Sequence, residues 1–224
     1  MAKQLNLEEQ EQIAQFKHWW SKNGNAITWL LIVVLAVFAG WNGWQYWERK
    51  TALQAAALYD ELERAVSSRE GERIQRVWAD MQANAGRSAQ AQQAALLVAR
   101  ALYEDGKAAE SKAALAWLVA ESKDTALTSV ARLRLAGLEL DAAAPDAALK
   151  WLDVTPPPDF VGLFADRRAD ALMLQDQRDQ ARAEYERAHA ALTESPDYRR
   201  LVEAKLAALG VNKAQPAPTQ EKPR

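Results

Sequence analysis

The hydrophobic pattern divides the chain into two parts. From residue 26 the apolar side chains follow one another without a period, and in the stretch AITWLLIVVLAVFAGW only Thr28 is polar. Asn42 and Gln45 are the only further polar residues before Trp47. Beyond residue 51, apolar residues return every three to four positions among Ala, Gln, Glu and Arg, which is typical of amphipathic helices. The pattern predicts one uniformly apolar helix followed by helices that each bury one face.

Residues 26–47 have the length and composition of a membrane-spanning helix. A helix of about 20 residues crosses the ~30 Å hydrocarbon layer, because each residue advances it by about 1.5 Å. The alternative is the buried helix of a large soluble core, which needs equally apolar segments around it. The rest of the chain offers none. We therefore expect a single transmembrane helix at residues 26–47.

Aromatic and cationic residues flank this predicted span. At 100° per residue the aromatics of WNGWQYWERK point all round a helix, so they cannot form one buried stripe. Trp and Tyr with this distribution are typical of the headgroup layer, where an apolar ring and a polar tip are both solvated. The predicted membrane-interface residues are Trp19, Trp20, Trp41, Trp44, Tyr46, Trp47, Arg49 and Lys50.

The flanks favour an uncleaved anchor over a cleaved signal peptide. Residues 1–25 carry both Glu and Lys ahead of the apolar run, whereas a signal peptide begins with a short basic region. Positive charges are nearly balanced across the span, so charge does not decide its orientation. The usual form of a short arm with a single span predicts a cytoplasmic arm at residues 1–25 and an exported domain behind the span.

The second part contains a candidate repeat. The sequence AALAWL at 113–118 recurs as AALKWL at 147–152, and ARAEYE follows at 181–186 after the same interval. The interval matches the period of a tetratricopeptide repeat, about 34 residues, in which pairs of antiparallel helices stack. The predicted repeat-packing residues are Ala113, Trp117, Ala147, Trp151, Ala181 and Tyr185. An ordinary helical bundle of Ala-rich helices is the alternative.

Helix breakers organise residues 51–210 into four helix pairs and a final capping helix. Gly106 suits the end of a helix, and Pro145 suits a first helical turn. Ser195 and Pro196 begin the capping helix. The prolines at Pro156–Pro158 predict a stiff extended link between the third and fourth pairs. We thus expect an all-α fold, a transmembrane helix followed by a tetratricopeptide-like α-solenoid, with a disordered polar tail at residues 211–224.

Composition and motifs point away from catalysis. The chain has no cysteine, which excludes disulfides and thiol chemistry, and residues 51–224 carry 23 Lys or Arg against 26 Asp or Glu, so no nucleic-acid partner is indicated. His18 and His189 lack a second ligand at metal spacing, and His189 is expected on an exposed helix face. Neither a phosphate-binding loop nor a nucleophile elbow occurs. We expect no catalytic, cofactor or metal site and no small-molecule substrate.

Three arginines form a candidate binding site. Arg100, Arg134 and Arg168 follow the same constant spacing, on the first helix of three successive pairs. In a helical-repeat solenoid the first helices line the concave groove, and Arg binds carboxylates or a peptide terminus in a bidentate manner. The alternative is that Arg is simply common on exposed helices.

The chain resembles the YfgM family of bacterial inner-membrane proteins, which are ancillary subunits of the SecYEG translocon. The resemblance is carried by the acidic and Gln-rich arm, by Asn23-Gly24 before the span, by Gly43-Trp44-Gln45-Tyr46-Trp47 at its exit and by the helical repeats, and it extends from about Leu7 to Gly210. It implies a cytoplasmic N-terminus, a periplasmic repeat domain, and association with the translocon and the periplasmic chaperone PpiD. The family contributes no catalytic residues.

These observations predict a membrane-anchored scaffold that works by binding other proteins. The alternative function is an envelope-organising repeat protein that serves cell-wall or division machinery.

Overall fold

The computed structural model describes residues 7–210, with side chains from residue 11 onward, and every element in this range is helical. The elements are α1 (Leu7–Ser67), α2 (Gly71–Ala85), α3 (Ala89–Glu104), α4 (Ala108–Glu121), α5 (Thr125–Asp141), α6 (Pro145–Leu152), the 3-10 turn η1 (Pro158–Phe160), α7 (Val161–Leu174), α8 (Arg178–Ala191) and α9 (Pro196–Ala208). The chain forms two compact units, Met1–Leu53 and Gln54–Arg224. The predicted tail at residues 211–224 lies outside the described residues.

In the first unit, α1 carries the apolar stretch. It is the one helix of the described residues that is long and apolar enough to cross a membrane, and only 6% of its most apolar window is buried. A helix of a soluble core would have most of this window buried, so exposure favours a lipid-facing helix. The predicted interface tryptophans Trp41 and Trp44 meet edge to face, with ring centroids 5.9 Å apart, and both rings face outward.

No helix end marks the domain boundary expected at residue 51. Helix α1 continues from the apolar stretch to Ser67 without a break. Residues 48–54, with the sequence ERKTALQ, contain neither Gly nor Pro, and most are good helix formers, so nothing in them ends a helix. The last turns of α1 serve as the first helix of the first repeat pair, where Leu62 and Ala65 are fully buried.

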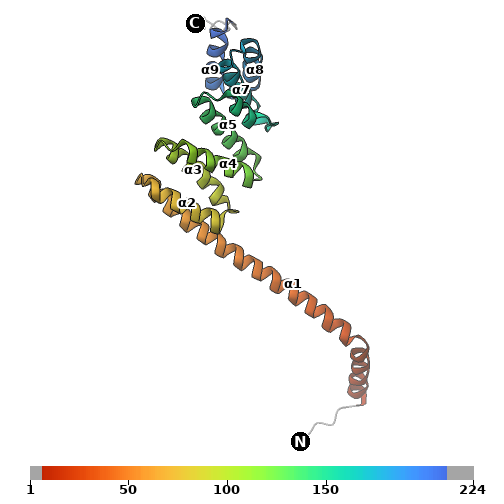
Figure 1. The fold of residues 1–224 in the computed structure, drawn as a ribbon. Helices are drawn as coiled ribbons and strands as arrows, with labels where there is room; N and C mark the ends of the chain where they lie inside the picture. Colours follow the sequence, from red (N-terminus) through yellow and green to blue (C-terminus); the bar gives the residue numbers. More distant parts are fainter. Residues whose placement is uncertain (1–6, 211–224) are drawn as a thin grey trace, which may run out of the picture. The chain divides into compact units, whose positions relative to one another are not determined.

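In the second unit, the helices stack in chain order (Figure 1). From α2 to α9 each helix packs against the next one, and α5 also contacts α7. The four expected pairs are present as the end of α1 with α2, α3 with α4, α5 with α6, and α7 with α8, and α9 covers the last pair. Pro145 and Pro196 occupy the first helical turns of α6 and α9, as the sequence predicts.

The same tight turn joins the two helices of every pair. Each turn has one residue in the left-handed region, and this residue is Arg69, Gly106, Ala143 or Asp176. In each turn the following N–H donates to the carbonyl five residues back, for example Lys107 N to Leu102 O at 2.8 Å and Gln177 N to Leu172 O at 2.9 Å. These are Schellman turns, which satisfy the last carbonyls of the first helix.

The positions of these turns correct the repeat period. The left-handed residues stand at 69, 106, 143 and 176, so the first two intervals are equal and the last is shorter. None of the three equals the constant period expected from the sequence. Positions five and nine residues after each turn are buried in all four pairs. The first set is Ile74, Ser111, Ala148 and Ala181, and the second is Trp78, Leu115, Leu152 and Tyr185. The turns therefore define the packing register.

Measured from the turns, the matched sequences AALAWL and AALKWL are not equivalent. Trp117 stands eleven residues after its turn and Trp151 eight, which differs by almost one helical turn, so both point to a similar helix face. Ala113 is exposed, so its expected packing role is wrong. Ala147, Trp117 and Trp151 are partly buried, whereas Ala181 and Tyr185 are buried. The two sequences are not equivalent because they stand 34 residues apart, whereas the turns at Gly106 and Ala143 stand 37 apart.

The proline-rich segment replaces the missing turns of α6. No helix is present from Asp153 to Pro157, and η1 begins at Pro158, so the predicted extended link is followed at once by a short turn. Phe160 in this turn and Phe164 of α7 pack with Leu152 of α6 in one apolar cluster. Through this cluster, the segment connects the apolar core of the third pair with that of the fourth.

Candidate functional site: an arginine pocket

A pocket of about 320 Å³ opens between α3 and α5 in the second unit. Tyr103 of α3, Leu138 of α5 and Leu115 of α4 supply apolar surface. Three cations line the same space, and we call them together the arginine pocket: Arg100 of α3, Arg134 of α5 and Arg167 of α7. The first helices of three successive pairs therefore each contribute a cation to this pocket.

Arg134 is the pocket cation with the least compensation. Its Nη1 donates to the carbonyl of Leu96 on α3 at 3.2 Å, which ties α5 to α3. Among the described residues, no carboxylate oxygen lies within 4 Å of its side-chain nitrogens. Burial lowers the pKa of Arg134, and the positive charge of Arg100 lowers it further. An arginine in this setting favours an added anion, because the anion would offset both costs.

The rim of the pocket is more nearly neutral. Arg100 Nε lies 2.8 Å from Glu104 one turn further along α3, and this bond raises the pKa of Arg100. The hydroxyl of Tyr103 donates to Asp141 Oδ2 of α5 at 3.0 Å, which raises the pKa of the phenol. The bond between Tyr103 and Asp141 joins α3 to α5. Asp141 is the one acidic side chain that lines the pocket together with the three arginines.

Arg167 has a side-chain N–H donor whose hydrogen bond is not satisfied in the described part of the chain. Its Nε is buried and has no hydrogen-bond partner within the described part of the chain. Its Nη1 lies 3.8 Å from Asp170, a distance too long for a strong ionic hydrogen bond. Buried polar groups in folded proteins are nearly always hydrogen-bonded, so the guanidinium of Arg167 is incompletely compensated.

The third member of the predicted arginine series is wrong. Arg168 does not line the pocket: its Nε pairs with Glu184 of α8 at 3.1 Å, and its Nη1 donates to the carbonyl of Leu152 at 3.3 Å. It therefore ties α7 to its neighbours. Arg134 and Arg167 both stand nine residues before their turns, so they occupy equivalent places. Counting from the turns would have found Arg167, but three of the four turns carry no glycine to mark them.

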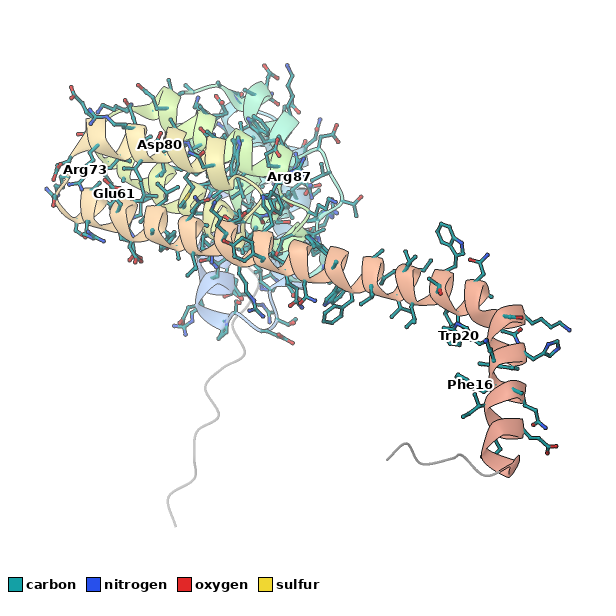
Figure 2. All side chains as sticks on the ribbon, turned by 90° about the horizontal axis from the view of Figure 1, so that it is seen from below. Phe16, Trp20, Glu61, Arg73, Asp80 and Arg87 are labelled. Atoms are coloured by element: carbon teal, nitrogen blue, oxygen red, sulfur yellow. The ribbon has the colours of Figure 1, made fainter. Side chains whose placement is uncertain are left out.

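A second hollow, at α2, is a poorer candidate. Figure 2 shows Arg73 and Glu61 near the turn that joins α1 to α2, and Asp80 further along α2. Arg73 lies 3.2 Å from Glu61 and 3.6 Å from Glu70. Carboxylates outnumber arginines in the lining of this hollow, and Arg73 is already paired, so the hollow does not favour an acidic ligand.

No chemistry beyond binding is apparent in the described residues. No group of three or more His, Asp or Glu there could hold a metal ion. His189 is buried, not exposed as expected, and its Nε2 lies 2.8 Å from Glu203 and 2.9 Å from Arg199 Nε of α9. It therefore helps to dock α9. The arginine pocket, with cations beside apolar walls, is suited to hold an acidic group attached to an apolar neighbour.

Comparisons with known proteins agree with this architecture. The chain is similar to three proteins named ancillary SecYEG translocon subunit. It is 26% identical to that of Neisseria gonorrhoeae over 91% of this chain and 98% of the relative. The corresponding values are 28%, 82% and 89% for Haemophilus influenzae, and 26%, 80% and 85% for Escherichia coli. The family resemblance stated from the sequence is thereby confirmed, although no solved structure matches the chain.

The family assignment rests on the repeat architecture itself. A family model described as a tetratricopeptide repeat-like domain matches residues 17–211, which include the apolar stretch and all four helix pairs. The expected solenoid and the matched model thus coincide, and the chain belongs to the tetratricopeptide repeat-like domain family.

Proposed function

We propose that this protein is a membrane-anchored scaffold that associates with the SecYEG translocon. Residues 1–25 form a cytoplasmic arm, residues 26–47 cross the inner membrane, residues 51–210 form a periplasmic repeat domain, and residues 211–224 follow it as a tail. The names of the three relatives support the translocon association. The repeat-like family model and the names of the relatives support a role in binding other proteins.

The observation that carries the binding role is the arginine pocket. A partner enters it as an extended segment with a carboxylate, from an acidic side chain or a chain end, which pairs with Arg134 and Arg167. Apolar side chains of the segment contact Tyr103, which is 46% exposed, and Leu138. A periplasmic chaperone such as PpiD, linked in this way to the translocon, is the partner that the family resemblance implies.

Photo-crosslinking in native membranes tests this function. Tyr103 is replaced by a photo-reactive phenylalanine analogue, because its ring is exposed at the pocket, and the covalent adducts are identified by mass spectrometry. Leu174 is the matched control, since it is 55% exposed at the end of α7 and does not line the pocket. We expect translocon subunits or an exported-protein chaperone from position 103 and not from position 174. Adducts with cell-wall or division proteins would favour the envelope-organising alternative.

Charge reversal separates pocket binding from mere proximity. Arg134→Glu should reduce the yield of the position 103 adducts by about tenfold or more, as expected for loss of a charge-assisted contact in a partly buried site. Arg178→Glu is the control, because the Arg178 side chain is 71% exposed on α8 and, among the described residues, its ion pair is with Asp176. Equal adduct yields in the two variants, with unchanged helical circular dichroism, would show that the arginine pocket does not hold the partner.

A further inference from the structure

The segment before the predicted span, Glu11–Lys22 of α1, has an exposed apolar face that begins well before the span. Ile13, Phe16 and Trp20 are between 47% and 63% exposed, although they lie outside the apolar stretch. At 100° per residue they fall within a sector of about 60°, spaced at i, i+3 and i+7. Glu11, Gln15, His18 and Lys22 fall on the opposite side. The segment is therefore an amphipathic helix of its own.

The aromatic side chains of this face form a continuous apolar stripe. The rings of Phe16 and Trp20 stack with centroids 6.1 Å apart, and Trp19 extends the cluster at 6.2 Å from Phe16. Phe16 and Trp20 project from the same side of α1 (Figure 2). Among the described residues of the first unit, nothing covers this stripe.

Local structure changes the direction of the helix after the stripe. Figure 2 shows the axis of α1 turning near Trp20. The side chains of Ser21 and Asn23 donate to the carbonyls of His18 and Trp19, at 3.3 Å and 3.2 Å, and such bonds compete with the helix ladder. Gly24 lets the Trp20 ring lie against the backbone, since a Cβ at this position would stand 3.1 Å from Trp20 Nε1. A helix that passes from a surface into a membrane needs such a turn.

We propose that Glu11–Lys22 lies on the membrane surface as an interfacial helix, with Ile13, Phe16 and Trp20 inserted among the lipid chains. The bilayer is the occupant that the chain itself brings close, because Trp20 is about 9 Å of helix from residue 26, where the predicted span begins. Lys17 and Lys22 against Glu11 give the segment a net positive charge, which suits anionic headgroups. Lys17 beside the stripe can extend its ammonium to the headgroup layer while its methylenes stay apolar.

Site-directed spin labelling of the full chain tests this placement. The sequence contains no cysteine, so single-cysteine variants need no other change. Phe16→Cys and the matched polar-face variant His18→Cys are labelled in liposomes of phosphatidylethanolamine and phosphatidylglycerol, and collisions with oxygen and with a water-soluble nickel chelate are measured. We expect the label at position 16 to collide mainly with oxygen and the label at position 18 mainly with nickel.

Two results would overturn the proposal. Equal nickel accessibility at both positions would mean that the segment projects into water. Shielding of position 16 from both reagents would mean that the stripe packs against protein, which in these liposomes is a second copy of the chain.

A charge variant gives an independent readout. With the label at position 13, Phe16→Glu should reduce the population of labels in the lipid phase roughly tenfold or more, because a large apolar side chain is replaced by a charge. Gln15→Glu adds the same charge on the opposite face and should leave the label in lipid. If both variants behave alike, the apolar stripe does not hold the segment on the bilayer.

Discussion

The two ends of the repeat domain are held together by different interactions. Around α2 and α4 the contacts are apolar: Met81 and Leu118 are fully buried, and Trp78 meets Trp117 edge to face with centroids 4.9 Å apart. Around α7 and α9 the core contains Leu192, Val202 and Leu206 beside alanines, and a buried polar network is added to it. Asp166 is 1% exposed there, and Lys205 of α9 reaches it at 2.8 Å.

The polar network determines how α9 is placed. Lys205 Nζ also lies 2.7 Å from Asp170, while the hydroxyls of Tyr198 and Tyr185 donate to Asp166 and Asp170, both at 2.7 Å. Small side chains such as Ala169 and Ala181 let α7 and α8 approach, but they bury little apolar area per residue. We therefore expect the end around α2 and α4 to be sensitive to loss of side-chain volume. The end around α7 and α9 should be sensitive to loss of a charge partner.

The largest expected effect is that of Lys205→Met. It leaves Asp166 buried without its cation, and removal of one partner from a buried ion pair typically costs about 3–5 kcal/mol. Hydrogen exchange of α9 should accelerate strongly, while that of α2 changes little. Lys123→Met, on the exposed link before α5, is the control. Unchanged exchange in α9 would show that the network does not hold this helix.

Leu118→Ala should weaken the opposite end. Leu118 is fully buried in the cluster that joins α1 to α5, so its truncation leaves a cavity and should cost about 3 kcal/mol. Exchange should increase in α3 and α4 and remain slow in α9. Leu174→Ala, at an exposed position, should have almost no effect. A loss of stability at α9 as large as that at α4 would contradict the independence of the two ends.

A smaller effect is expected at the turns, because the left-handed position is occupied by glycine in one pair and by alanine in another. Gly106 has φ +76°, so Gly106→Ala should cost about 1 kcal/mol, whereas Ala143 already holds φ +53° with a Cβ and Ala143→Gly should be neutral or slightly stabilising. Denaturant midpoints of the detergent-solubilised protein measure both. Destabilisation by the two changes alike would mean that the backbone angle does not set the cost.

The smallest effect on stability is expected from the tyrosines of the network, and it arises only above pH 10. Burial, followed by the hydrogen bonds to Asp170 and Asp166, raises the pKa of Tyr185 and Tyr198 above the usual value of 10. Because the folded pKa is raised, this contribution to stability is fully present below pH 10 and is lost as the pH rises through the folded value. Protection of the α9 amides, measured against their intrinsic base-catalysed exchange rates, should therefore begin to fall near pH 10, and protection of the α4 amides at higher pH. Loss of protection in α9 and α4 at the same pH would show that the two tyrosines do not set the pH dependence of the α9 end.

The arginine pocket shows where sequence reasoning reached its limit. Arg100 and Arg134 were found by a constant spacing, but the same spacing selected Arg168, which pairs with Glu184. One residue along a helix rotates a side chain by about 100°, so a register error of one places it on another face. The turns at positions 69, 143 and 176 have no sequence mark of the kind that Gly106 provides, so their unequal intervals could not be read beforehand.

The sequence by itself determined the apolar anchor, the four helix pairs, the final helix and the family, because hydrophobic runs, helix periodicity and the residues Gly106, Pro145 and Pro196 act locally along the chain. Only the tertiary structure decided which arginine faces the pocket, how Lys205 meets Asp166 and that His189 is buried. These features depend on the lengths of the second helices and the links between pairs, which set how far each helix is shifted against its neighbours. Residues distant in sequence meet only after those shifts have been made.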